Sequence, residues 1–197
     1  MLLQEGNIYH IYNRGNNKEK IFFKPDNYHY FLHKLHHHLL PHCDILAYVL
    51  MPNHFHFLVF ANSNTVKSSG NHPISRNVFS EGLRNFLSSY TQAINKQENR
   101  TGSLFTQNTR FKSLSDSTDR DLYSLTCFHY IHQNPLKAQL VTKIEDWQYS
   151  SFRDYAGLRK GTLCNQELSK KILTVNFDDI YRESYQVTDS EIIKKIF

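Results

Sequence analysis

Two histidines separated by one residue, His54 and His56, have the spacing in this sequence that most directly suggests metal chemistry. They follow the turn-forming residues Pro52 and Asn53 and open an aromatic and β-branched run, which predicts a β-strand. Successive side chains of a strand point to opposite faces, so both imidazoles should emerge on one face. Two imidazoles placed in this way can hold one divalent cation. A pair of strand histidines is more often incidental than metal-binding, so the rest of the chain must decide between these interpretations.

A tyrosine and an asparagine lie four residues apart in a later segment of the chain. We expect a helix there over about residues 119–132 or 119–133, ending before Pro135 because a residue that precedes proline disfavours the helical conformation. Side chains four positions apart lie on nearly the same face of a helix. Tyr130 and Asn134 should therefore be neighbours.

The chemistry open to these groups is attack by Tyr130 on a phosphodiester, with Asn134 adding an oxygen ligand to the two histidines. A free phenol has a pKa of about 10 and is mostly protonated at neutral pH, so it needs a more electrophilic phosphorus, which a divalent cation supplies. Two neutral imidazoles and an amide oxygen leave the cation open to phosphate and water, which suits Mg²⁺ or Mn²⁺. A phosphotyrosine ester keeps the energy of the broken bond, so the strand can be rejoined without ATP.

Spacing alone leaves the assignment of the tyrosine open. Tyr123 lies two turns earlier on the same predicted helix, a helix tyrosine is usually a packing residue, and asparagine before proline is a common helix end. Further histidines, His33 and residues 36–38, lie in an earlier predicted helix. Three consecutive helical positions span most of a turn and cannot all face one metal, so we expect a solvated, partly basic face there.

The elements that must position these groups are short strands and amphipathic helices separated by turn-rich loops. Periodicity and turn residues predict strands over residues 8–13 and 45–50, helices over about 28–39 and 78–95, short extended segments at 104–105 and 110–114, a loop over 62–76 and a last helix over about 188–196. Residues 45–50 should pair with the histidine strand as a hairpin.

Composition restricts the class of protein. A chain of 197 residues is long enough for one domain with a proper core. Its charge of +5, with 12 Tyr and 14 Phe, allows a single-stranded nucleic acid as partner, because bases stack on rings and phosphates meet cations. Three separated cysteines suggest a reducing cytoplasm. No apolar run approaches membrane-spanning length and the N-terminus turns polar early, so we expect a cytoplasmic protein with no membrane partner.

Five motifs follow one another in an order that resembles the single-tyrosine HUH transposases, and among them the REP-associated tyrosine transposase branch. They lie at residues 9–16, 51–56, 110–112, 130–135 and 147–157. The resemblance covers roughly residues 6–157. The histidine–aromatic–histidine triplet alone is only moderately specific, and its order with the Tyr-x-x-x-Asn-Pro segment is what makes the resemblance specific.

The resemblance implies an α+β fold with a ferredoxin-like antiparallel sheet backed by helices. It implies a catalytic domain over residues 1–160 and a C-terminal extension over 161–197, to which no motif assigns a role. His54, His56 and Asn134 would be the ligands of Mg²⁺ or Mn²⁺, and Tyr130 would be the nucleophile that leaves a 5′-phosphotyrosine link and a free 3′-hydroxyl. The substrate would be single-stranded DNA near hairpins of repetitive palindromic elements, and the chain departs from the family at none of these four positions.

Four basic side chains, Arg14, Arg110, Lys112 and Lys137, are expected to contact DNA phosphates, although basic side chains are commonly just solvated. Two other functions stay open: a protein that binds hairpin DNA without using the chemistry, and a HUH-type replication or conjugation initiator. Initiators often carry a helicase domain, and this chain has no Walker-type Gly-x-x-x-x-Gly-Lys run. Related single-tyrosine enzymes work as dimers that exchange the tyrosine helix, so a homodimer also stays open.

Overall fold

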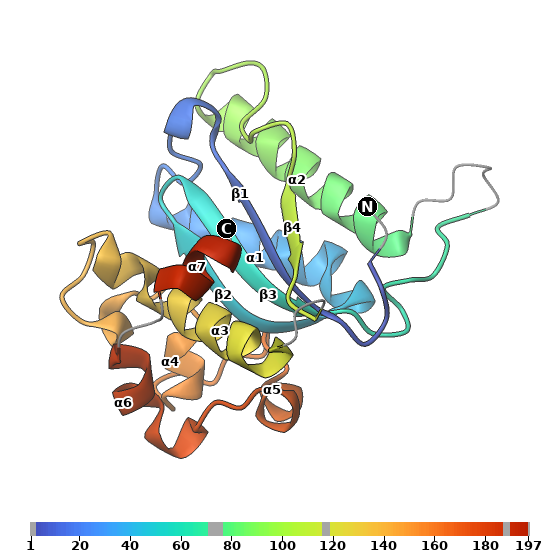
Figure 1. The fold of residues 1–197 in the computed structure, drawn as a ribbon. Helices are drawn as coiled ribbons and strands as arrows, with labels where there is room; N and C mark the ends of the chain where they lie inside the picture. Colours follow the sequence, from blue (N-terminus) through green and yellow to red (C-terminus); the bar gives the residue numbers. More distant parts are fainter. Residues whose placement is uncertain (1–2, 71–76, 116–118, 187–189, 197) are drawn as a thin grey trace.

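The centre of the molecule is a four-stranded antiparallel sheet with the strand order β2-β3-β1-β4 (Figure 1). The computed structural model describes residues 3–70, 77–115, 119–186 and 190–196. The strands are β1 (Ile8–Arg14), β2 (Asp44–Met51), β3 (His54–Phe60) and β4 (Arg110–Ser113). The histidine strand β3 is therefore an inner strand, and it forms the predicted hairpin with β2.

Helices cover both faces of the sheet. On one face, Phe31 of α1 (Pro25–His38) packs against Phe55 and Phe57 of β3, with ring centroids 5.3 and 6.3 Å apart, and α2 (Val78–Gln97) lies beside α1. On the other face, α3 (Arg120–Lys137) lies against β2 and β3 (Figure 1). Because side chains alternate along β3, Phe55 and Phe57 face α1, whereas His54 and His56 face α3.

The order β1-α1-β2-β3-α2-β4 confirms the predicted α+β fold with an antiparallel sheet backed by helices. The predicted face of solvated histidines on α1 is confirmed for His33, His36 and His37, which are exposed, whereas His38 is partly buried. Residues 104–105 are not a strand, and only Phe105 forms an isolated bridge, to Gly15. Within the described residues, no helix combines the length and the apolar character needed to cross a bilayer.

The prediction that the third helix ends before Pro135 is wrong, because α3 continues to Lys137. Proline costs this helix only the hydrogen bond to the carbonyl of residue 131, in the last turn. The side-chain Nδ2 of Asn134 donates to the Tyr130 carbonyl at 2.9 Å, and the N–H of Ala138 donates to the Asn134 carbonyl at 2.9 Å. Bonds on both sides of the proline therefore hold the last turn together.

The chain after residue 160 packs back onto the domain rather than projecting from it. The packing elements are α5 (Gln166–Ile172), which lies against β2, and α6 (Ile180–Tyr185) and α7 (Ser190–Ile196), which lie against α3 (Figure 1). The side chain of Gln133 on α3 donates to the carbonyls of Ser184 and Gln186 at 2.9 Å each. The segment thus supports the helix that carries Tyr130, and the division of the chain at residue 160 stays a prediction. The short α4 (Phe152–Tyr155) precedes it.

Candidate active site

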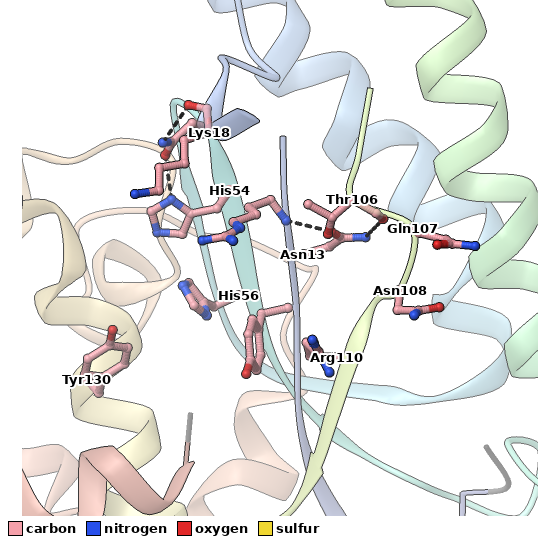
Figure 2. A pocket seen from close by; sticks show the side chains of 12 residues that line it. Asn13, Lys18, His54, His56, Thr106, Gln107, Asn108, Arg110 and Tyr130 are labelled. Carbon is pink, nitrogen blue, oxygen red and sulfur yellow. Dashed lines mark hydrogen bonds between the residues drawn. The ribbon is translucent and has the colours of Figure 1, made fainter. Parts of the chain in front are cut away.

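The pairing of β1 with β3 gathers polar side chains on the face that α3 only partly covers. His56 lies opposite Tyr12, His54 lies opposite Arg14, and Arg110 of β4 lies opposite Tyr12 on the other side of β1. Directly opposed residues in an antiparallel pair share a face. These five side chains line one pocket of about 590 Å³, and Tyr130 of α3 lines it from the opposite wall (Figure 2).

The two imidazoles lie side by side, as the alternation of the strand predicts. Their ring centroids are 5.0 Å apart at an interplanar angle of 86°, and the ring of His56 lies 6.1 Å from the ring of Tyr130. His56 is only 4% exposed, so it belongs to the buried interior and is not a strand-surface residue. Tyr12 and His10 pack against its ring and enclose it.

Burial keeps both imidazoles uncharged at neutral pH. Burial is the main reason why the pKa of His54 is lowered to about 4. A contact with Asn134 raises this pKa, and the nearby charge of Arg14 lowers it. Burial also lowers the pKa of His56 well below the ordinary value, with contributions from His10 and His54. A histidine binds a metal through a neutral ring, so these shifts prepare both residues as ligands.

Asn134 is 9% exposed and contacts both His54 and Tyr130. Its contact raises the pKa of His54, which is the effect of a carboxamide oxygen that faces the ring. Its Nδ2 donates to the Tyr130 carbonyl at 2.9 Å. In the described part of the chain, no group of three His, Cys, Asp or Glu side chains is arranged to hold a metal, so a third protein ligand beside the two imidazoles would be this amide oxygen.

The hydroxyl of Tyr130 is held mostly as the neutral phenol. Burial raises the pKa of Tyr130, the contact with Asn134 lowers it, and Cys127 and Tyr12 raise it. The ammonium of Lys137 lies 5.2 Å from the centroid of the Tyr130 ring. Such a phenol reacts as a nucleophile only when it loses its proton during the attack.

The remaining predicted residues divide between the pocket and its surroundings. Arg14 and Arg110 line the pocket, and Lys112 is exposed on the same face of β4, two residues further along the strand. Lys137 is exposed and lies over the ring of Tyr130. Tyr123 is partly buried, packs against the hydrophobic core and is not among the residues that line this pocket.

Three further residues contact the site and received no role from the sequence. His10 Nε2 lies 2.9 Å from His56 Nδ1, Asn53 Oδ1 lies 2.6 Å from His54 Nδ1, and Tyr12 lines the pocket. His10 and Tyr12 depend on the register of β1 against β3, which composition does not reveal. The alternation of β1 was the one available signal, since it puts both on a single strand face.

No protein-family model matches the sequence, and no curated protein is a match in sequence. Among solved structures, the chain is similar to a REP-associated tyrosine transposase bound to a REP hairpin, with a TM-score of 0.55. The similarity covers 81% of this chain and 85% of that chain, at 19% sequence identity. At this identity the comparison establishes a shared α+β fold and no more.

Proposed function

We propose that this chain is a HUH-type transposase of the REP-associated branch, which cleaves and rejoins single-stranded DNA beside hairpins through a 5′-phosphotyrosine intermediate. One observation carries the proposal: His54 and His56 of a strand and Tyr130 of the facing helix line one pocket, and Asn134 contacts both His54 and Tyr130. The shared fold with a transposase that binds a REP hairpin supports it independently.

The donor set fits a divalent cation. Both histidines are uncharged at neutral pH, and the amide oxygen of Asn134 faces His54. An oxygen and two imidazole nitrogens suit Mg²⁺ or Mn²⁺ with open positions for phosphate and water. When bound there, the cation would neutralise charge on the non-bridging oxygens of the scissile phosphate.

The proposed role of Tyr130 is nucleophilic attack of its phenolic oxygen on phosphorus. The phenol loses its proton, the bond from phosphorus to the 3′-oxygen breaks, and the released 3′-oxygen takes up a proton. Attack by a 3′-hydroxyl on the phosphotyrosine reverses these changes and rejoins the strand. Asn134 assists at the start, because its contact lowers the pKa of a phenol that burial otherwise raises.

The exposed half of the sheet offers a path for the DNA strand next to this pocket. Arg14, Arg110 and Lys112 point to the same face as the two histidines, and Tyr12 lies among them. Cations that meet phosphates beside an aromatic ring on which a base can stack are the usual means of holding single-stranded nucleic acid.

The test is incubation with labelled single-stranded DNA that contains a hairpin, in the presence of Mg²⁺ or Mn²⁺, followed by a denaturing gel. The proposal predicts a DNA adduct that survives denaturation, and none with a duplex of unrelated sequence. Tight binding of the hairpin DNA without an adduct, in every metal tested, would instead identify a binding protein that does not use the chemistry.

A further inference from the structure

Each histidine of the site has its Nδ1 atom occupied by a second side chain from outside the ligand set. Asn53 meets His54, and His10 meets His56. A neutral imidazole carries one proton, on either Nδ1 or Nε2, and only the other nitrogen can donate a lone pair to a metal. The partner at Nδ1 therefore determines whether Nε2 carries a proton or a lone pair.

The orientation of the Asn53 amide follows from its second contact. Its Nδ2 donates to the backbone carbonyl of Lys18 at 3.2 Å, and a carbonyl can only accept a hydrogen bond (Figure 2). The atom that faces His54 is consequently Oδ1, which also only accepts, at 2.6 Å from Nδ1. The contact with Asn53 therefore favours a proton on Nδ1 of His54, which leaves the lone pair on Nε2.

The position of Asn53 is itself fixed by the backbone. The N–H of Gly15 donates to the Asn53 carbonyl at 2.8 Å, and the N–H groups of Ile21 and Phe22 donate to the Pro52 carbonyl at 2.9 and 3.2 Å. The segment after β1 thus holds the turn between β2 and β3 in place. Because Asn53 in this turn contacts His54, the segment also helps to fix the orientation of the His54 ring.

The partner of His56 is a second, more deeply buried histidine. His10 is fully buried, its ring stacks on the ring of His56 with centroids 5.1 Å apart, and its Nε2 lies 2.9 Å from His56 Nδ1. Either nitrogen can be the donor in this pair. If His56 Nδ1–H donates, the Nε2 of His56 carries a lone pair, as it does in His54.

We infer that Asn53 and His10 are positioning residues that hold His54 and His56 as Nδ1–H tautomers, so that both present an unprotonated Nε2 to the same pocket. The inference deepens the proposed function, because these tautomers are the ones that bind a cation through Nε2. Partners of this kind typically contribute about 10–100-fold to metal affinity.

The tautomers can be measured in the metal-free protein. Long-range ¹H–¹⁵N spectra of ¹⁵N-histidine-labelled protein at pH 7.5 distinguish protonated from unprotonated ring nitrogens, and the loss of one signal set in His54→Ala and in His56→Ala assigns them. We expect Nδ1–H and a bare Nε2 for both residues. An Nε2–H signal for either residue overturns the inference for that residue.

Mn²⁺ affinity, measured by electron paramagnetic resonance of the free ion, tests the consequence. Asn53→Ala and His10→Phe should weaken binding about 10–100-fold. Asn53→Asp and His10→Gln, which keep an oxygen acceptor for Nδ1–H, should recover most of the affinity. The matched control is Asn16→Ala, since Asn16 also donates to a backbone carbonyl, that of Ser103 at 3.0 Å, but contacts neither histidine.

Equal affinity of Asn53→Ala, His10→Phe and the unaltered protein, all folded by circular dichroism, would overturn the inference. If the unaltered protein binds no Mn²⁺, the metal-assisted part of the proposed function fails. In that case the spectra of the metal-free protein still decide whether the two tautomers are held as inferred.

Discussion

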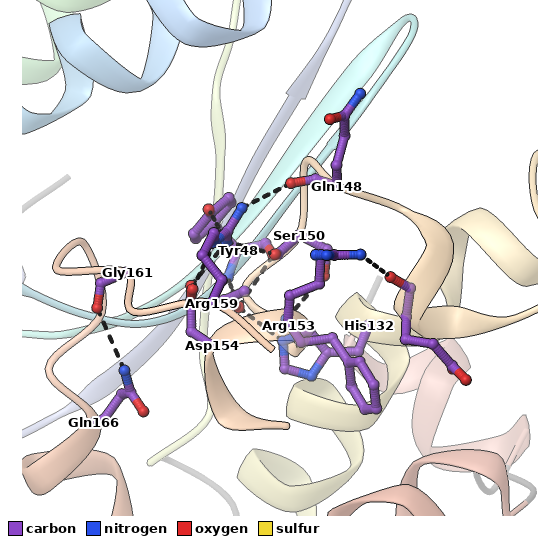
Figure 3. Close-up of polar contacts among 12 residues, drawn as sticks. Tyr48, His132, Gln148, Ser150, Arg153, Asp154, Arg159, Gly161 and Gln166 are labelled. Atoms are coloured by element: carbon purple, nitrogen blue, oxygen red, sulfur yellow. Dashed lines mark hydrogen bonds and ion pairs between the residues drawn. The ribbon is translucent and has the colours of Figure 1, made fainter. Parts of the chain in front are cut away.

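Two polar clusters that lie against the sheet differ in how their charges are balanced. In the closed cluster, around Arg159 and Asp154, the charged groups pair with one another. Arg159 donates to both carboxylate oxygens of Asp154 at 2.6 and 2.8 Å, to the Tyr48 hydroxyl at 2.8 Å, and to the carbonyls of Gln148 and Ser150 at 2.8 and 2.9 Å (Figure 3). Three of these acceptors face Nη2, and Nε and Nη1 face one acceptor each. Its charge is balanced by the carboxylate of Asp154, so the cluster joins its segments through contacts within the protein.

The pocket around His54 and His56 is the opposite kind of cluster. Among the residues that line it, none is Asp or Glu, while Arg14, Lys18 and Arg110 bring positive charge. The neutral imidazoles of His54 and His56 add ring nitrogens that carry lone pairs. A structural cluster is internally balanced, whereas under the proposed function this one would be completed by a cation and a polyanion from outside. Substitutions in the two clusters should therefore affect different properties.

The largest effect is expected for a histidine of the pocket. His54→Ala removes one ligand and should abolish DNA cleavage and reduce Mn²⁺ binding by at least 100-fold, because one ligand of three is lost. The melting temperature should change little, since His54 is only partly buried. Cleavage assays and thermal unfolding measure both properties, and His36→Ala, at an exposed histidine of α1, is the control. Normal cleavage by His54→Ala would remove this residue from the site.

The closed cluster should show the reverse pattern. Arg159→Met leaves the carboxylate of Asp154, whose side chain is 1% exposed, without its cation. The free energy of unfolding should fall by about 3 kcal/mol, the lower end for a broken buried pair because Arg159 is itself partly exposed. Urea unfolding measures this change. Mn²⁺ affinity of the folded fraction should stay within about twofold, and a larger loss would show that the two clusters are coupled.

The pH dependence of metal binding distinguishes buried from ordinary histidines. A ring with the ordinary pKa of about 6.5 would lose about fourfold in metal affinity between pH 8 and pH 6 through proton competition. The pKa of His54 is lowered to about 4 by burial, so this ring stays neutral until the pH falls towards that value. We expect Mn²⁺ affinity to be nearly flat from pH 8 to pH 6. A fall of tenfold or more over this range would contradict the assigned environments.

The same shift predicts how stability responds to acid. The unfolded chain protonates His54 near its ordinary pKa, while the folded chain keeps it neutral, so the unfolded state binds more protons. Stability should therefore fall as the pH drops from about 6.5 to about 4. Denaturant unfolding across this window should show a shallower decline in His54→Gln than in the unaltered protein. Parallel declines in the two proteins would mean that His54 is not buried as described.

The smallest effect is expected for the basic side chains around the pocket. Arg110→Gln and Lys112→Gln should each weaken single-stranded DNA binding and lower the slope of log affinity against log salt by about 0.7, because each phosphate contact releases counterions. Arg84→Gln is the matched control, at an exposed arginine of α2 paired with Glu81. Fluorescence anisotropy between low and moderate salt measures the slopes, and an equal change in Arg84→Gln would mean that the charge acts without a contact.

Much of this arrangement follows from local patterns in the sequence. Alternation on β3 predicts that His54 and His56 share a face, and helical spacing predicts that Tyr130 and Asn134 are neighbours. Both predictions hold: His54, His56 and Tyr130 line one pocket, and Asn134 contacts His54 and Tyr130. The roles of these residues stay proposals, because shared geometry alone does not show chemistry.

Local sequence patterns do not reveal the register in which two strands pair, nor the contacts between residues far apart in the chain. The positions of His10 and Tyr12 beside His56 depend on how β1 pairs with β3. The role of Asn53 depends on a carbonyl that lies 35 residues away in the chain. Pro135 misled the helix prediction because side-chain and backbone hydrogen bonds around Asn134 hold the last turn of α3.

The identity of the nucleophile tests the central claim most directly. Labelled hairpin-bearing single-stranded DNA is incubated with Mn²⁺ and the unaltered protein, Tyr130→Phe or Tyr123→Phe, and the covalent adduct is quantified on a denaturing gel. The account predicts an adduct in the unaltered protein and in Tyr123→Phe, and none in Tyr130→Phe, which should still bind the DNA. An adduct that persists in Tyr130→Phe would contradict it.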